Sequence, residues 1–333
     1  MRVIRTTMMQ ILAGLIFFSC ASWAQNPPAI KVPKSEEAQE TIKVDVNVTS
    51  ILFNVRDNHG KLLPNLHKED FQVYEDGESQ AVKYFTANSD LPLTLGILLD
   101  TSGSQANVLQ MEKEVGSRFL KQIIQPKDLA FVISFDVNVD QLQDFTNDPR
   151  ELGKALDKGR INTGGGAGGG WPGIGQGPIA ISHPKGTLLR DAVWLASREK
   201  LARESGRKAL ILLTDGEDNG SKTTVHEAIE AAQKADTILY VLLCADRGGW
   251  GGRGENEMKK LTEETGGRVI DVGNKFEKLQ EAFDQIANEM RSQYSLGYTP
   301  TNKTQDGSYR KLEIKSSVGK VQARKGYYAK FQQ

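Results

Sequence analysis

Four continuous apolar runs between residues 93 and 244 constrain the fold of this chain more than any other feature. They read LTLGILLD, LAFVISF, ALILLTD and ILYVLLC. Unbroken runs of this kind are typical of parallel strands that are covered on both faces, whereas a half-exposed strand alternates apolar and polar residues. We therefore expect these runs to form the central strands of a buried parallel sheet.

Amphipathic helical patterns lie between and after these runs. Apolar residues recur at helical spacing in two stretches, which comprise Val108, Met111, Val115, Phe119 and Ile123 in the first and Phe276, Leu279, Phe283, Ile286 and Met290 in the second. Alternation of strands and helices is the pattern of a doubly wound α/β domain. The sequence predicts this Rossmann-like domain at residues 91–291.

The segment before this domain has β character. Residues 42–48 alternate apolar and polar side chains, and the alternation changes parity at Thr49 and Ser50, which predicts a strand with a bulge or a change of face. The stretch FQVYEDGESQAVKYF predicts a hairpin that turns at Asp76 and Gly77.

The segment after the domain also contains short strand-like stretches, separated by turn residues. Neither flank has enough strands to be stable alone. We therefore expect residues 41–90 and 292–333 to pair into one small β-sandwich, with the α/β domain inserted between them. Two independent β modules are the alternative.

The first 24 residues have the pattern of an export signal. Two arginines precede an apolar stretch that is too short to span a bilayer, and small residues at Ser22 and Ala24 predict cleavage before Gln25. Lipidation of Cys20 is the alternative, which the two phenylalanines shortly before it disfavour. Either route gives an exported protein, periplasmic or secreted, in which residues 25–40 form a disordered linker.

Charge and residue counts exclude several classes of partner and site. Lysine plus arginine and aspartate plus glutamate both total 42, and this balance gives no indication of a nucleic-acid or membrane partner. The four histidines are too scattered for a zinc site, and Cys244 lies in an apolar run, where a buried strand residue is expected. The glycine-rich run TGGGAGGG neither ends a strand nor opens a helix, so we expect no nucleotide site there.

The first apolar run ends at Asp100 in the stretch LLDTSGSQ, which raises two interpretations. An acid protease uses Asp-Thr-Gly and needs a second such carboxylate to share a proton. Here Ser102 stands where that glycine would be, and the second candidate, Asp215, is followed directly by Gly216 without the hydroxyl residue. The α/β surroundings also differ from the all-β architecture of that enzyme, so the protease interpretation fails.

A metal site is the second interpretation, because oxygen-bearing side chains follow several strand ends. Asp100 and Asp215 close apolar runs, Ser102 and Ser104 follow Asp100 at alternate positions, and Thr187 precedes a helix. The carboxyl ends of parallel strands meet at one edge of a sheet, where open α/β folds bind ligands. Two carboxylates and three hydroxyls suit a hard divalent cation, although each residue alone could be a helix cap or a turn residue. A cation held largely by hydroxyls keeps positive charge and attracts a partner's carboxylate.

The motifs LLDTSGS, GTLLRDA and LLTDGEDN, in this order, resemble the metal-ion-dependent adhesion site (MIDAS) of von Willebrand factor A domains. The flanking segments resemble those of the secreted bacterial A-domain-related family. This resemblance implies a Rossmann-like A domain that binds Mg²⁺, or alternatively Mn²⁺ or Ca²⁺, and that engages a protein ligand without catalysis. Gln105 departs from the family, which often has methionine there, without touching the ligands. The implied metal residues are Asp100, Ser102, Ser104, Thr187 and Asp215.

Two tryptophans in glycine-rich loops, Trp171 and Trp250, are candidate contacts for the protein ligand because both loops are expected at the same sheet edge. Two alternatives to this adhesion-type function remain. A metal-dependent hydrolase is disfavoured because no histidine or spare glutamate is fixed at the site as a base. A structural A-domain module without a metal-mediated ligand is the other.

Overall fold

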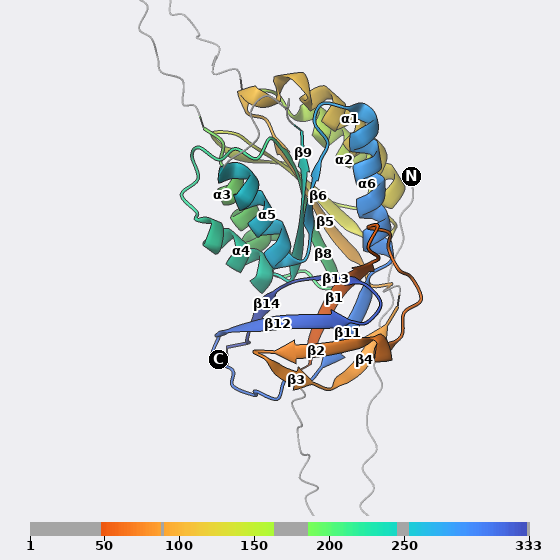
Figure 1. Ribbon diagram of the computed structural model, residues 1–333. Helices are drawn as coiled ribbons and strands as arrows, with labels where there is room; N and C mark the ends of the chain where they lie inside the picture. Colours follow the sequence, from red (N-terminus) through yellow and green to blue (C-terminus); the bar gives the residue numbers. More distant parts are fainter. Residues whose placement is uncertain (1–47, 88–89, 163–185, 245–252, 332–333) are drawn as a thin grey trace, which may run out of the picture. The chain divides into compact units, whose positions relative to one another are not determined.

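The computed structural model describes residues 48–87, 90–162, 186–244 and 253–331, which form an α/β domain and a two-sheet β-sandwich (Figure 1). The described residues all belong to one structural unit, Val46–Gln333. The predicted fold class, a doubly wound α/β domain flanked by antiparallel sheets, is confirmed. The predicted signal peptide and linker lie outside the described residues.

The α/β domain is built on a six-stranded sheet with the order β10-β9-β8-β5-β6-β7. Only the β6–β7 pair is antiparallel, and the four apolar runs form β5, β6, β8 and β9, as predicted. The chain adds β6 on one side of β5 and β8 on the other, so its direction reverses between β5 and β8, where such folds bind ligands. The strands are β5 (Leu93–Asp100), β6 (Leu129–Phe135), β7 (Val139–Thr146), β8 (Arg207–Thr214), β9 (Thr237–Leu243) and β10 (Arg268–Asp271).

Helices cover both faces of this sheet, with α1, α2 and α6 on one face and α3, α4 and α5 on the other (Figure 1). Successive side chains of β5 enter opposite cores, because Leu99 belongs to the first and Leu98 to the second. The predicted apolar stripes lie on α1 and α6, where Phe119 stacks on Phe283 with ring centroids 4.4 Å apart. The helices are α1 (Leu109–Ile123), α2 (Pro149–Lys158), α3 (Leu189–Leu195, continued by a π-helical turn, Ala196–Leu201), α4 (Val225–Lys234), α5 (Arg253–Thr265) and α6 (Phe276–Arg291).

Gly96 allows the centre of β5 to pack tightly. A Cβ atom at this position would lie 2.4 Å from side-chain carbons of both Leu210 and Phe131. The glycine therefore fits the space between two large neighbours, a common reason for glycine inside a strand.

The sandwich contains two four-stranded sheets, ordered β13-β1-β11-β4 and β14-β12-β2-β3. Strands from the two flanks pair directly, because β1 lies between β11 and β13, and β2 pairs with β12. A short 3₁₀ turn, Lys68–Asp70, precedes β2. The strands are β1 (Thr49–Arg56), β2 (Phe71–Glu75), β3 (Glu78–Gln80), β4 (Val82–Thr86), β11 (Tyr294–Tyr298), β12 (Tyr309–Ser316), β13 (Lys320–Ala323) and β14 (Gly326–Tyr328).

Local predictions for the sandwich agree with the structure where it is described. Asp76 and Gly77 both have positive φ, 50° and 88°, and form the predicted turn between β2 and β3. Ile51 and Phe53 are buried on one face of β1. The predicted bulge or change of face at Thr49 and Ser50 is not seen, because Thr49, Ile51 and Phe53 are all buried and this part of β1 pairs with β11 without a register shift. The alternating stretch at residues 42–47 lies outside the described residues.

Two further sequence expectations concern Cys244 and membrane spans. Cys244 is fully buried and free, as expected, but it lies directly after β9 and not within the strand. No helix within the described ranges is long and apolar enough to cross a membrane.

A buried carboxylate joins the sandwich to the α/β domain. Glu289 of α6 has no exposed side-chain surface and lies 2.5 Å from Arg56 of β1. Arg268, at the start of β10, donates to the same carboxylate from Nε and Nη2 at 2.9 and 2.6 Å. Gln322 of β13 donates to its second oxygen at 3.2 Å. One carboxylate therefore forms ion pairs with two arginines, one from each half of the molecule.

Candidate functional site

Asp100 is the last residue of β5, and its carboxylate is completely buried. The Ser102 N–H donates to Oδ1 at 2.9 Å, and the Thr214 hydroxyl, from the end of β8, donates to Oδ2 at 2.6 Å. Each carboxylate oxygen therefore has one hydrogen bond within the protein and retains lone-pair capacity for a further ligand. The role of Thr214 was not predicted from the sequence.

Ser102 and Ser104 lie together in the turn that follows β5. Their hydroxyl oxygens are 3.0 Å apart, and Ser102 is largely buried while Ser104 is exposed. Ser102 is the N-cap of the 3₁₀ turn Gly103–Asn107, yet its side chain makes no capping hydrogen bond. The alternative that Ser102 serves as a helix cap is therefore contradicted.

Asp215 follows β8 and lies near Asp100. Burial raises the pKa of Asp100 to about 7, hydrogen bonds from Ser102 and Thr214 oppose this rise, and the charge of Asp215 adds to it. Asp215 also accepts the Glu217 N–H at 3.0 Å, so the side chain stabilises its own turn as the alternative interpretation expected. The neighbouring Gly216 has a φ of 82°, a conformation that favours glycine.

Thr187 is buried in the segment that leads into α3. The N-cap of α3 is Leu188, so Thr187 is not the cap of this helix. The Leu188 N–H donates to the Asp136 carbonyl at 2.8 Å, which fixes the segment beside β6. On its other side the segment approaches Gly220, where an added Cβ would lie 2.9 Å from Leu188 Cδ2 and 3.7 Å from the Thr187 nitrogen. Thr187 thus lies against the loop that begins with Asp215.

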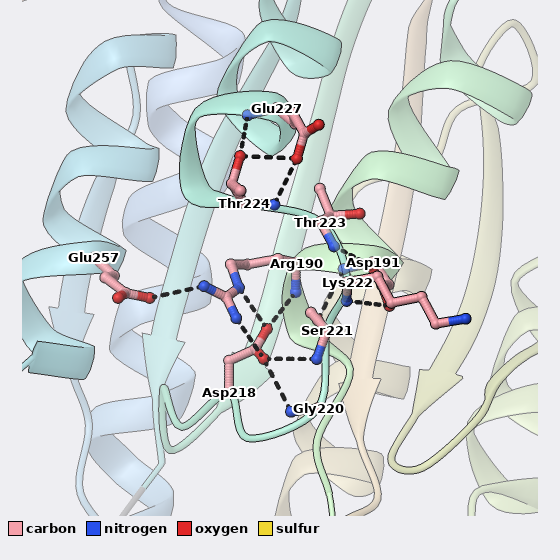
Figure 2. Close-up of polar contacts among 10 residues, drawn as sticks. All are labelled: Arg190, Asp191, Asp218, Gly220, Ser221, Lys222, Thr223, Thr224, Glu227 and Glu257. Atoms are coloured by element: carbon pink, nitrogen blue, oxygen red, sulfur yellow. Dashed lines mark hydrogen bonds and ion pairs between the residues drawn. The ribbon is translucent and has the colours of Figure 1, made fainter.

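An ion pair connects the Thr187 segment to this loop (Figure 2). The Arg190 guanidinium donates to both oxygens of Asp218 at 3.1 Å, and the Arg190 N–H donates to the same carboxylate at 2.8 Å. The Asp218 side chain is 2% exposed and also accepts the Ser221 N–H at 3.1 Å. A second carboxylate, Glu257 of α5, lies 3.7 Å from Arg190.

A carboxylate of α3 itself, Asp191, strengthens this connection from the opposite direction (Figure 2). Asp191 accepts the N–H groups of Lys222 and Thr223 at 3.1 and 2.8 Å. These amides directly precede α4, whose N-cap is Thr224 in a capping box with Glu227. The Asp191 carboxylate therefore accepts hydrogen bonds from backbone amides just before α4. Together with the bonds from Arg190 to Asp218, these contacts set the relative position of the Thr187 and Asp215 loops.

A further buried acid lies near the two aspartates. Burial raises the pKa of Glu112 to about 8, contact with the Cys244 thiol opposes the rise, and the charges of Asp100 and Asp215 add to it. Glu112 belongs to the first turn of α1 and has no exposed surface. The sequence does carry a signal for it, because Glu112 follows Val108 by four residues and so places a carboxylate on the apolar stripe.

The structure thus brings Asp100, Ser102 and Ser104 together, places Asp215 nearby, and fixes Thr187 against the Asp215 loop. Among the described residues, no three histidine, cysteine, aspartate or glutamate side chains converge as metal ligands. The candidate donors are accordingly two carboxylates and three hydroxyls, an all-oxygen set that fits a hard divalent cation. The contact candidates Trp171 and Trp250 lie outside the described residues.

Comparison with known families gives one match by sequence. Residues 184–285 match the von Willebrand factor type A domain, a range that includes Thr187, Asp215 and the network of Figure 2. A search of curated proteins finds no match.

Comparison of the coordinates gives similar solved structures. They include BatB from Bacteroides thetaiotaomicron, with 20% identity over 60% of this chain and 100% of that chain and a TM-score of 0.44. The vWF domain of the type V pili tip protein Mfa5 from Porphyromonas gingivalis shares 14% identity over 60% of this chain and 94% of that chain, with a TM-score of 0.45. Proximal thread matrix protein 1 from the mussel byssus, solved with a zinc-occupied MIDAS motif, shares 19% identity over 66% of this chain and 50% of that chain, with a TM-score of 0.48. Likeness at this level does not bear on the ligand of the present chain.

Proposed function

Since this chain carries a von Willebrand factor type A domain, we propose that it binds a divalent cation at the carboxyl edge of its sheet and uses it to hold a partner protein. Mg²⁺ is the ion we expect, with Mn²⁺ and Ca²⁺ as alternatives. When bound, the cation would supply a positive charge that a carboxylate of the partner completes. The proposed ligands are Asp100, Ser102, Ser104, Thr187 and Asp215.

The buried, hydrogen-bonded carboxylate of Asp100 beside two neighbouring hydroxyls is the observation that most supports a cation site. Burial raises the pKa of this group to about 7, so the protein alone does not stabilise its charge fully. A divalent cation nearby would favour the ionised form. Each Asp100 oxygen already accepts a hydrogen bond from the protein. If the hydroxyls coordinate the cation directly and the carboxylates act mainly through water, the cation keeps positive charge that a partner's carboxylate can balance.

We further propose that the site binds its ligand without catalysing a reaction. A hydrolase would need a base near the cation, most often a histidine or a glutamate. Glu112 does lie near the two aspartates, contrary to the sequence expectation, but it has no exposed surface from which to reach a substrate. Of the three histidines that the structure describes, His59 and His67 belong to the sandwich flank and His226 lies on α4. The N-terminal pattern supports the proposal that the protein acts after export, in the periplasm or outside the cell.

Calorimetric titration of the full mature chain with Mg²⁺ and with Mn²⁺ tests the cation site. Asp215→Ala should weaken binding by well over tenfold, because loss of even an outer-shell partner typically costs about 10- to 100-fold. Glu217→Ala is the matched control, since it removes an exposed carboxylate from the same loop and should leave the titration unchanged. Unchanged affinity in Asp215→Ala would refute the proposed site.

Capture of partners from the exported fraction, with and without a chelator, tests the second half of the proposal. Retention that a chelator abolishes and that Thr187→Ala weakens supports a cation-held ligand. Retention that is indifferent to the chelator indicates an A domain that works as a structural module. Turnover of ester or peptide substrates that depends on added metal would instead favour the hydrolase.

A further inference from the structure

A basic cleft lies at the opposite end of the sheet from the candidate cation site. Its volume is about 1210 Å³, and its walls come from β1 and β13 of the sandwich and from the α5–β10 turn and the end of α6 in the α/β domain. Arg268, at the amino end of β10, lines it, whereas Asp100 is the last residue of β5 and Asp215 follows the carboxyl end of β8. The two sites are therefore separate. We call this cavity the basic cleft; its cationic wall comprises Arg56, Lys61, Arg268, Arg291, Lys320 and Lys325.

The charge of the basic cleft is strongly unbalanced, although the whole chain is formally neutral. Six lysine and arginine side chains line it, and the only lining carboxylate among the described residues is Glu263. The buried Glu289 behind the wall neutralises part of the charge of Arg56 and Arg268. Concentrating like charges in one concave site produces a positive potential that attracts anions.

The cations fall into a fixed group and a free group. Arg56 and Arg268 are held by Glu289, and Arg291 donates to the Gln122 carbonyl at 3.0 Å. By contrast, Lys61, Lys320 and Lys325 are exposed and form no ion pair within the described ranges. A preorganised wall with exposed, unpaired cations beside it is suited to bind a ligand that carries several negative charges.

The lining also limits the class of ligand. The cavity exceeds the roughly 300–1,000 Å³ of ordinary small-molecule sites, which favours an extended ligand. None of its lining residues in the described part of the chain is a phenylalanine, tyrosine or tryptophan, whereas proteins that bind single-stranded nucleic acid stack bases on such rings. Leu62, Pro64 and Val321 add apolar surface that an aliphatic side chain would cover. Side-chain amides, among them Asn288, can bond a peptide backbone.

We propose that the basic cleft binds an extended acidic polypeptide segment of a partner, with carboxylates against the lysines and aliphatic side chains against the apolar floor. Recognition of acidic motifs by clustered cations is an established mode of peptide binding. This second surface does not depend on the cation site, so a partner can be held at both ends of the α/β domain.

Fluorescence anisotropy with a short labelled peptide of alternating glutamate and leucine tests this proposal on the full mature chain. We expect binding that weakens between about 50 mM and about 300 mM NaCl, because salt screens exposed charges. A matching peptide of lysine and leucine should not bind. A chelator should leave the affinity unchanged, which separates this site from the proposed cation site.

Charge reversal supplies the decisive variants. Lys320→Glu with Lys325→Glu should weaken the acidic peptide at least about tenfold, since each reversal replaces an attraction by a repulsion. Lys303→Glu with Lys311→Glu makes the same change in net charge at exposed sandwich positions outside the cleft. Equal weakening in both pairs would overturn the proposal, as would tighter binding of a sulfated oligosaccharide than of the peptide. Thermal melts verify that all variants are folded.

Discussion

The buried Glu289 allows a sharp test of how the two halves of the molecule are joined. Glu289→Gln keeps the side-chain size but removes the negative charge that faces Arg56 and Arg268. The carboxylate has no exposed surface, whereas the side chains of these arginines are 19% and 26% exposed. Removing one partner of a buried ion pair costs about 3–5 kcal/mol, and water can partly rehydrate the arginines, so we expect a loss of about 3 kcal/mol in the free energy of unfolding.

Urea unfolding followed by circular dichroism and by tryptophan fluorescence measures this loss. Glu281→Gln is the matched control, because Glu281 is an exposed glutamate on the same helix and should change the free energy by less than about 0.5 kcal/mol. If the carboxylate couples the sandwich to the α/β domain, the variant should no longer unfold in one step, and the two probes should give separate transitions. A loss below about 1 kcal/mol, the level of a surface ion pair, would refute the assigned role of Glu289.

Three further predictions concern the candidate site and the sheet. Without metal, the folded-state pKa of Asp100, about 7, lies above its ordinary value of 3.8, so folding takes up a proton and this group's contribution to stability falls as pH rises from about 4 to above 7. With a chelator present, lowering the pH from 7 to 6 should therefore stabilise the wild type by about 1 kcal/mol more than it stabilises Asp100→Asn, as measured by thermal melts of both proteins. An equal gain in the two proteins would contradict the raised pKa of Asp100. Asp218→Asn should destabilise the fold by about 1–3 kcal/mol and weaken cation-dependent capture of partners, because Arg190 loses its charged partner beside the Thr187 segment; retained stability and capture would show that the pair does not position this segment. Gly96→Ala should lower stability by about 1–3 kcal/mol, since its Cβ would overlap Phe131, and an unchanged melting temperature would mean that the strand relaxes freely.

Long apolar runs made the core of the fold predictable from the sequence. The runs at β5, β6, β8 and β9 are unambiguous because both faces of these strands are buried. β7 was not predicted, since it is an edge strand whose residues, VDQLQDFT, are partly or fully exposed and follow no clear alternation. The short edge strand β10 gives an equally weak signal.

The candidate donors were predictable because they follow strand ends directly, and strand ends can be read from the sequence. The side chains that hold them were not. Thr214 reaches Asp100 across 114 positions, and Arg190 reaches Asp218 across 28, so only the folded sheet edge brings them together. Hydrogen bonds at such separations leave no local pattern in a single sequence.

The insertion of the α/β domain between two neighbouring strands has a consequence for the order of folding. β4 leads into the domain and β11 leaves it, and the two pair with Ser295 opposite Thr86. In an unfolded chain, closing a loop of this length costs about 5 kcal/mol of entropy before the pair gains any contact. A folded α/β domain holds its two ends near each other and removes most of that cost, whereas its own strand–helix units form from shorter-range contacts. The sandwich should therefore assemble last, and a chain whose α/β domain fails to fold would leave both flanks as unpaired strands.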